Sequence, residues 1–232
     1  SHKVAKSQSH KVVKSQRTDP ETLRPWDLAT LKKGENMKNK RNTIILIVGV
    51  VVLIAFWFIG KYNGLVNKEE NVNSKWAQVE NVYQRRADLI PNLVATVKGY
   101  AEHEQQVLTD VIAARSKATS MNINADNLTE ENIQAFQAAQ DQLSGALSRL
   151  LVTVEKYPDL KANQNFMELQ AQLEGTENRI TVERKNFNEA VKDYNTGLRR
   201  FPTNIVANMF GFDKKAYFES APGSEVAPKV EF

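Results

Sequence analysis

An uninterrupted apolar run constrains this chain more than any other feature of its sequence. Residues 44–60 read IILIVGVVVLIAFWFIG, without a charged or strongly polar side chain, and Thr43 extends the run. At about 1.5 Å of rise per residue, a helix of this length just reaches the roughly 30 Å of hydrocarbon in a bilayer. We therefore expect residues 43–60 to contact the lipid bilayer as a single transmembrane helix.

A cleaved signal peptide is the main alternative for this run. Its apolar region would be shorter and would be followed by small residues at a cleavage site. Here the run ends in the bulky Phe56-Trp57-Phe58 and is followed by Lys61-Tyr62. Because Trp and Tyr collect at the membrane interface, the sequence favours an uncleaved anchor.

Basic residues flank the run unequally, which bears on its orientation. Those before it are clustered, whereas those after it are spread out and accompanied by glutamates. The positive-inside rule then predicts a cytoplasmic N-terminus, with residues 61–232 on the other side. The residues concerned are Lys38, Lys40 and Arg41 before the run and Lys61, Lys68, Glu69 and Glu70 after it.

The first 36 residues read differently from the rest. Residues 1–8 (SHKVAKSQ) and 9–16 (SHKVVKSQ) form a near-identical polar repeat, and no sustained apolar period follows before Met37. Met37 then opens a basic cluster and the apolar run, as at a natural membrane-protein N-terminus. We expect residues 1–36 to be a non-native or disordered leader, and residues 37–60 to form the anchor.

The charge and cysteine content exclude several functions. The net charge is +4, and residues 1–36 hold eight Lys/Arg and four Asp/Glu, so the remainder of the chain is neutral. Nucleic-acid binding draws on clustered positive charge, so we expect no nucleic-acid partner. The chain has no cysteine, which excludes disulfides, thiolate zinc sites and cysteine nucleophiles.

Residues 61–218 carry apolar side chains at heptad-like spacing in three stretches. These run over residues 72–111, 133–157 and 166–201. The pattern predicts an all-α fold, in which an elongated antiparallel bundle of three long helices follows the transmembrane helix. Pro91 lies inside the first stretch and predicts a kink or split there. The breakers between and after the stretches are residues 121–129, Tyr157-Pro158 and Phe201-Pro202.

Catalytic and metal-binding constellations are sparse. His103 is the one histidine in residues 37–232, and a single histidine is too few for a histidine-rich zinc site. The sequence has neither a Gly-x-Ser-x-Gly elbow nor a phosphate-binding glycine loop. We expect no enzyme activity, no metal and no cofactor. A hydrolase that uses His103 as a general base is the remote alternative.

Arg85 and Arg86 stand in the densest local pattern, beside Pro91. A basic corner at a kinked helix is a candidate partner contact. The structural alternative is that Asp88 and Asn92 cap backbone groups freed by the proline.

The C-terminal part of the chain supplies the other candidate contacts. Its aromatic residues cluster after residue 209, and residues 219–232 read as a flexible tail ending in VEF. A hydrophobic-x-hydrophobic carboxyl terminus can add as a strand to a peptide-binding domain, although a frayed tail is the simpler interpretation. The candidate residues are Phe210, Phe212, Tyr217, Phe218, Val230 and Phe232.

Several motifs resemble the bacterial LemA family. They are YNGLV (62–66), RRADLIPNLVATVKGYAEHE (85–104), SRLLVTVEKYPDLKANQNFMELQAQLEGTENRI (148–180), FNEAVKDYNTGLRRFP…GF…YF (187–218) and the terminal PKVEF. The resemblance covers residues 37–232 and implies one N-terminal membrane helix followed by a helical bundle at residues 61–218. It also implies a short N-terminus outside the cell, opposite to the charge reading, so orientation stays open.

The resemblance implies an accessory role without established enzymatic activity. Genes of this family often neighbour those of membrane-associated proteases or other envelope proteins. We expect a single-pass scaffold or adaptor of the bacterial cytoplasmic membrane that binds an envelope protein, with a membrane protease as one candidate. A self-assembling homo-oligomer is the alternative.

Overall fold

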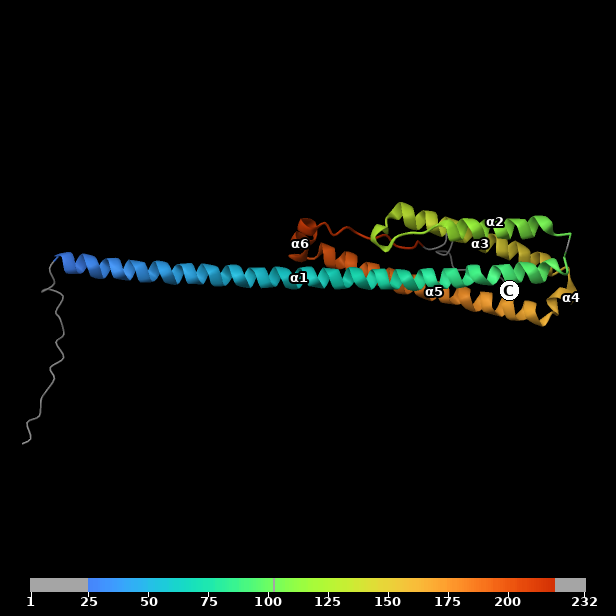
Figure 1. The fold of residues 1–232 in the computed structure, drawn as a ribbon, viewed down its shortest axis with the longest axis horizontal. Coiled ribbons are helices and arrows are strands. Elements are labelled where there is room, and N and C mark those ends of the chain that lie inside the picture. Colours follow the sequence, from blue (N-terminus) through green and yellow to red (C-terminus); the bar gives the residue numbers. More distant parts are fainter. Residues whose placement is uncertain (1–24, 102, 220–232) are drawn as a thin grey trace, which may run out of the picture. The chain divides into compact units, whose positions relative to one another are not determined.

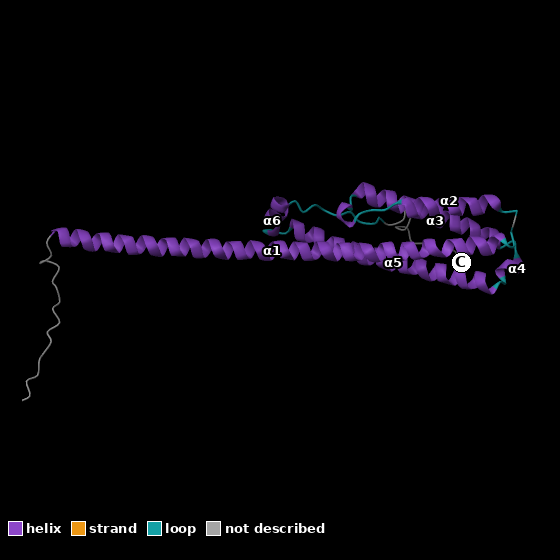
Figure 2. Ribbon diagram, in the orientation of Figure 1, coloured by secondary structure: helices purple, strands orange, loops and turns teal. Residues whose placement is uncertain are grey.

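The structure is a computed structural model that describes residues 25–101 and 103–219, and these residues are all-helical (Figures 1 and 2). Neither range contains a strand, which confirms the predicted fold class. The chain divides into two compact units between Phe56 and Trp57. The elements are α1 (Pro25–Lys98), α2 (Gln105–Ser120), the 3₁₀ turn η2 (Ala125–Asn127), α3 (Glu130–Val154), α4 (Pro158–Lys161), α5 (Gln164–Arg199) and α6 (Thr203–Phe210).

The first unit contains the N-terminal part of α1. Its apolar side chains face outward, with Leu53 69% exposed and Ile44 60% exposed. Within the described residues, one helix is long and apolar enough to cross a membrane, and its most apolar window has a mean hydropathy of 2.9. The expected apolar helix is therefore present. The predicted leader lies largely outside the described residues.

Pro91 does not split α1, so of the kink or split expected there the split is wrong. The helix continues to Lys98, and the chain turns over residues 99–104 before α2 begins. A proline inside a helix leaves the carbonyl four residues earlier without its donor. That carbonyl belongs to Ala87, and Arg115 Nε of α2 donates to it at 2.7 Å. A side chain from a neighbouring helix thus replaces the missing hydrogen bond.

The second unit packs the rest of α1 against α2, α3 and α5. Arg86 of α1 contacts Glu177 of α5, whereas Lys68 pairs with Asp193, so α1 and α5 run antiparallel. Lys117 Nζ donates to Gln142 Oε1 at 2.9 Å, between α2 and α3. The first heptad stretch is thus not one rod. It is divided between α1 and α2, which run in opposite directions.

Local capping explains where α3, α5 and α6 begin or end. Thr129 Oγ1 accepts from Asn132 N at 3.3 Å, and Asn163 Oδ1 accepts from Phe166 N at 3.1 Å. Both caps satisfy N–H groups that the first turn of a helix leaves free. α6 ends at Gly211, whose φ of 73° is left-handed and suits glycine. The chain then turns back along the bundle.

The buried side chains of the second unit form two clusters. The aromatic cluster is rich in rings and includes Leu65, Val72, Trp76, Val79, Tyr83, Phe136, Phe187, Tyr194, Val206 and Phe218. The aliphatic cluster is built mainly from Leu, Val, Ile and Ala and includes Ile90, Leu93, Val97, Leu108, Val111, Leu143, Leu150, Leu160 and Leu173.

Candidate partner-binding site

Arg86 is buried between the two clusters. Its side chain is only 2% exposed, although its charge must be matched. Its Nη1 donates to Ser144 Oγ at 2.8 Å and to Glu177 Oε2 at 2.9 Å. Its Nη2 donates to the side-chain and main-chain oxygens of Gln140, at 2.6 and 3.3 Å. The planar guanidinium fork is therefore engaged on two sides.

We call Arg86 and its partners Gln140, Ser144 and Glu177 the Arg86 layer. This layer connects all four long helices, α1, α2, α3 and α5. Gln140 of α3, itself buried, donates from Nε2 to the carbonyl of Ala118 in α2 at 3.4 Å. The guanidinium also lies 5.0 Å from the centre of the Tyr83 ring, within cation–π range. Arg86 therefore faces the inside of the bundle and is not the exposed contact that we expected. Arg85, by contrast, is exposed.

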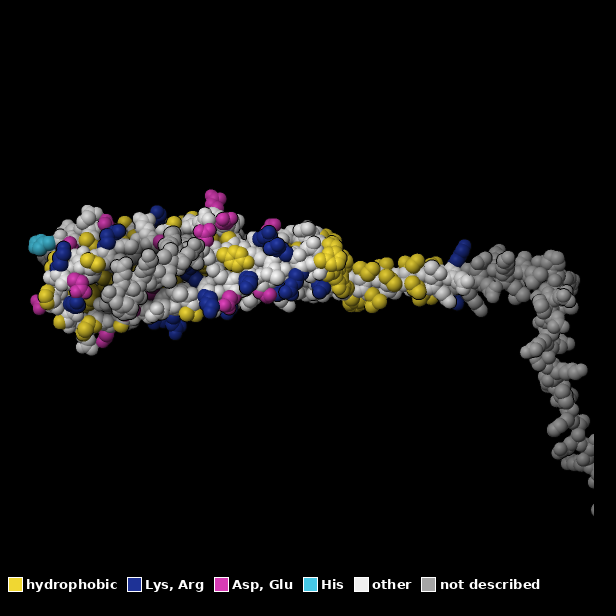
Figure 3. Space-filling model, turned by 180° about the vertical axis from the view of Figure 1, so that it is seen from behind, with side chains coloured by type: hydrophobic (Ala, Val, Ile, Leu, Met, Phe, Trp, Pro, Cys, Tyr) yellow, Lys and Arg dark blue, Asp and Glu magenta, His cyan; other side chains and the backbone are white. Residues whose placement is uncertain are grey.

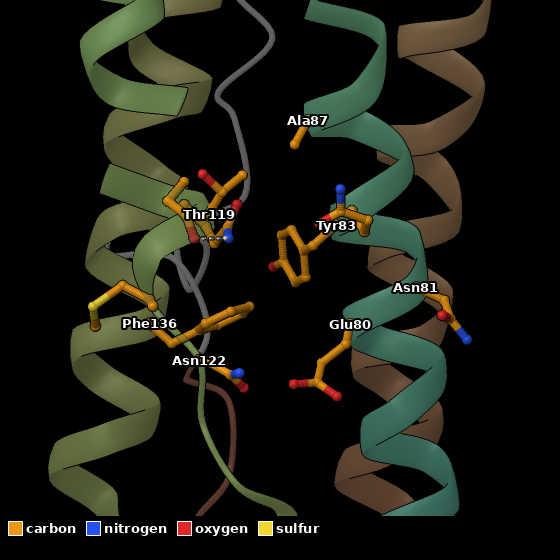
Figure 4. A pocket seen from close by; sticks show the side chains of 11 residues that line it. Glu80, Asn81, Tyr83, Ala87, Thr119, Asn122 and Phe136 are labelled. Atoms are coloured by element: carbon orange, nitrogen blue, oxygen red, sulfur yellow. Dashed lines mark hydrogen bonds between the residues drawn. The ribbon is translucent and has the colours of Figure 1, made fainter. Parts of the chain in front are cut away.

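A cavity of about 250 Å³ opens beside this layer, between α1, the end of α2 and α3. Tyr83 and Phe136 lie next to one another in its lining (Figure 4), and their rings meet edge to face with centres 5.1 Å apart. Glu80 lies at the α1 side, with Thr119 and Asn122 opposite (Figure 4). The cavity therefore has two aromatic rings in its lining together with several polar side chains.

Glu80 gives this cavity an electrostatic preference. Burial raises the pKa of the Glu80 carboxyl, and the Trp76 indole N–H partly offsets that rise. Desolvation disfavours the charged form of a carboxylate. An approaching ammonium or guanidinium would offset that cost, so the cavity favours a cationic or hydrogen-bond-donating group.

Residues 212–219, which we name the strap, run back along the bundle in an extended conformation. Asn195 pairs with both main-chain groups of Lys215, at 2.8 and 3.1 Å. Asn188 does the same with Phe218, at 2.9 Å for both bonds. The two asparagines lie seven residues apart on one face of α5, about 10 Å, which three extended residues also span. The side-chain amides thus make the main-chain hydrogen bonds that a neighbouring β-strand would otherwise make.

Phe218 anchors the strap in the aromatic cluster. Its ring stacks on Trp76 at 5.9 Å and meets Phe187 edge-on at 5.5 Å. Arg184 covers the ring from outside at 4.7 Å. The strap is further held where Lys215 Nζ pairs with Glu69 Oε1 at 3.1 Å. Phe218 is therefore a buried core residue, whereas the sequence suggested it as a candidate partner contact.

The remaining candidate residues that the structure describes lie outside the lining of the cavity. Phe210 and Phe212 contact Tyr62 of α1, with ring centres 4.9 and 5.6 Å apart. Tyr217 is exposed. Val230 and Phe232 lie outside the described residues. His103 is exposed in the turn between α1 and α2. Across the described ranges, no group of three His, Cys, Asp or Glu side chains is placed to hold a metal ion.

Sequence reasoning missed the residues that hold the site together. Gln140 was visible as a polar residue at a core position of its heptad stretch. Asn188 and Asn195 had no comparable signal, because an asparagine on a helix usually faces water. Glu80 likewise has no feature in the sequence that separates it from the other glutamates of the helices.

The comparisons with known proteins agree with this architecture. The LemA family model matches residues 75–232, a shorter range than the resemblance drawn from motifs. The chain is 24% identical over 200 residues to magnetosome protein MamQ 2 of Paramagnetospirillum magneticum, which covers 78% of this chain and 74% of that protein. It is 22% identical over 178 residues to protein LemA of Metamycoplasma hominis, covering 77% and 78%. Because the family match takes in more than half of the chain and every helix from α2 to α6, the protein belongs to the LemA family.

Proposed function

We propose that this protein is a non-enzymatic scaffold of the bacterial cytoplasmic membrane, anchored by residues 43–60. The observation that carries the proposal is the exposed apolar surface of that helix. Side chains such as Leu53 and Phe56, both 69% exposed, are covered by no described part of the chain. Lipid is the solvent that suits such a surface, because exposing it to water would be costly.

The cavity beside Tyr83 and the strap are the proposed contacts for a partner. The cavity has two aromatic rings in its lining, and the cross-linked Arg86 layer beside it supports a fixed shape. The partner that we propose is another envelope protein, with a membrane protease as the first candidate. A basic or hydrogen-bond-donating side chain of that partner would meet Glu80.

Site-specific photo-crosslinking in native membranes tests the proposal. A crosslinker at Asn122, in the lining of the cavity, is expected to capture one membrane protein in stoichiometric yield. A crosslinker at the exposed Val182 of α5 is the matched control. Glu80→Lys should reduce capture about tenfold, since like charges repel in a partly desolvated site. Capture of the chain itself from both positions would favour the self-assembling oligomer instead.

Three further measurements address the anchor, the side of the membrane that holds the bundle, and the proposed absence of catalysis. Resistance of the full chain to alkaline extraction is expected, and loss of the chain into the soluble fraction would contradict the anchor. Protease access to the bundle in intact and opened cells then assigns its side of the membrane. His103→Ala should leave the cellular phenotype unchanged, and loss of function would revive the hydrolase.

A further inference from the structure

α6 has two apolar faces, of which the bundle covers one. Val206 and Ala207 are buried. Ile205 and Met209, one turn apart on the same side, are 46% and 61% exposed. Phe210 at the end of α6 is 55% exposed, and Phe201 just before α6 is 81% exposed.

These exposed side chains are unusual in their density. Single exposed apolar residues are normal on soluble proteins, but a contiguous patch marks an interaction surface. Figure 3 shows hydrophobic side chains gathered at the α6 end of the bundle. α6 itself, TNIVANMF, contains no charged residue. Its outer face therefore offers apolar contact without the ion pairs that a protein partner would use for orientation.

The position of α6 relative to the apolar run indicates what covers this face. Phe210 and Phe212 pack on Tyr62, which lies two residues after Gly60, the last residue of the run. Two helical residues correspond to about 3 Å. Lys61 lies over the ring of Trp57 at 5.8 Å, as interfacial aromatic and basic residues commonly do. The α6 end of the bundle is thus in contact with α1 close to Gly60, where the apolar run ends.

The charges around this face fit a lipid surface. Arg199 and Arg200 are exposed directly before Phe201, and Lys214 is exposed after α6, with Asp213 as its acidic neighbour. Basic side chains beside an apolar helix face are typical of helices that bind the interface of anionic bilayers.

We propose that the outer face of α6, together with Phe201 and Tyr62, binds the interface of an anionic bilayer. Ile205, Met209 and Phe210 enter the boundary between headgroups and acyl chains, and Arg199 and Arg200 meet anionic headgroups. The proposal rests on anchoring by residues 43–60, which brings α6 to the surface. It adds a second membrane contact that supports the bundle against the bilayer.

Depth-dependent quenching tests this contact. Because the chain has no cysteine, Met209→Cys provides a single site for an environment-sensitive dye on the full-length protein. The protein is placed in nanodiscs of phosphatidylcholine with a quarter phosphatidylglycerol and with spin-labelled lipids as quenchers. Leu53→Cys reports the anchor, and Val182→Cys on α5 is the negative control. We expect quenching at position 209 to exceed that at 182 about threefold.

The outcomes separate this contact from the anchor. Strong quenching at 53 with equal, weak quenching at 209 and 182 would overturn the α6 proposal and leave the anchor standing. Weak quenching at 53 would overturn the anchor itself. Disulfide dimers of the unlabelled Met209→Cys protein, together with weak quenching of the labelled protein at position 209, would show that a second copy covers the face and would also overturn the proposal.

A charge variant provides an independent test that does not alter the apolar face. Arg199→Gln with Arg200→Gln should lower quenching at position 209 about twofold in anionic nanodiscs and leave it unchanged in purely zwitterionic ones. Unchanged quenching in both would contradict the headgroup contact. The far-ultraviolet circular dichroism of each variant shows that the bundle remains folded.

Discussion

The aromatic cluster and the aliphatic cluster, which are the two halves of the bundle core, are closed in different ways. In the aliphatic cluster, branched side chains from helices close the core by themselves. In the aromatic cluster, rings leave space that helices alone do not close, and the strap inserts Phe218 onto Trp76. The strap's main chain is then paired by asparagine side chains. An extended segment can therefore complete a helical core when side chains supply its hydrogen bonds.

The largest expected effect comes from a substitution in the aromatic half, compared with one in the aliphatic half. Phe218→Ala should lower the free energy of unfolding by about 4 kcal/mol, because a large buried ring is lost. It should also release the strap, so that trypsin cleavage after Lys214 rises about tenfold. Leu150→Ala, in the aliphatic cluster, should cost about 3 kcal/mol without changing that cleavage. Equal cleavage in both variants would show that the strap is not held by Phe218.

Arg86→Ala should weaken both halves at once. It leaves the buried oxygens of Gln140 and Ser144 without their donor, at a cost of about 3 kcal/mol. Glu177→Ala should also cost about 3 kcal/mol, because it leaves the buried guanidinium of Arg86 without its carboxylate. Urea unfolding, followed by Trp76 fluorescence with Trp26 and Trp57 replaced by Phe, measures both. A cost below about 1 kcal/mol for Arg86→Ala would refute the internal role of Arg86.

A double-mutant cycle sharpens the account of the aliphatic half. Arg115→Ala should cost about 1.5 kcal/mol, because the carbonyl of Ala87 loses the donor that replaces the N–H missing at Pro91. With Pro91→Ala, the new N–H at position 91 can donate to that carbonyl. The cost of Arg115→Ala should then fall by about 1 kcal/mol. Additive costs would mean that Arg115 acts elsewhere.

The smallest effect concerns alkaline pH in the aromatic half. Burial raises the pKa of the Tyr194 hydroxyl above its ordinary value of 10.0, and the Glu69 carboxylate raises it further. The folded chain thus keeps a proton that the unfolded chain releases, so stability falls as pH rises above 10. Tyr194→Phe should remove about 1 kcal/mol of this loss between pH 9.5 and 11. An unchanged slope would assign the loss to other groups, including Tyr83, whose pKa burial also raises.

The halves also differ in how far they could be predicted from sequence. Apolar periodicity predicted helices throughout and the exposed run at residues 44–60, because both depend on local spacing. The reversal after Lys98 could not be predicted, since the donor that carries α1 through Pro91 comes from another helix. The buried position of Phe218 could not be predicted either, because its hydrogen-bond partner also lies on another element. Its main chain is paired by Asn188, thirty residues away in sequence.

The Arg86 layer limits how the length of this bundle can change during evolution. One guanidinium binds Gln140 and Ser144 of α3 and Glu177 of α5 at the same time. A seven-residue insertion in one helix shifts every following contact by two turns and separates these groups. The bundle can become longer and keep the Arg86 layer only if two helices joined by a turn gain the same number of residues. Both insertions must lie on the same side of the layer. Family members of different size should therefore differ by matched pairs of insertions.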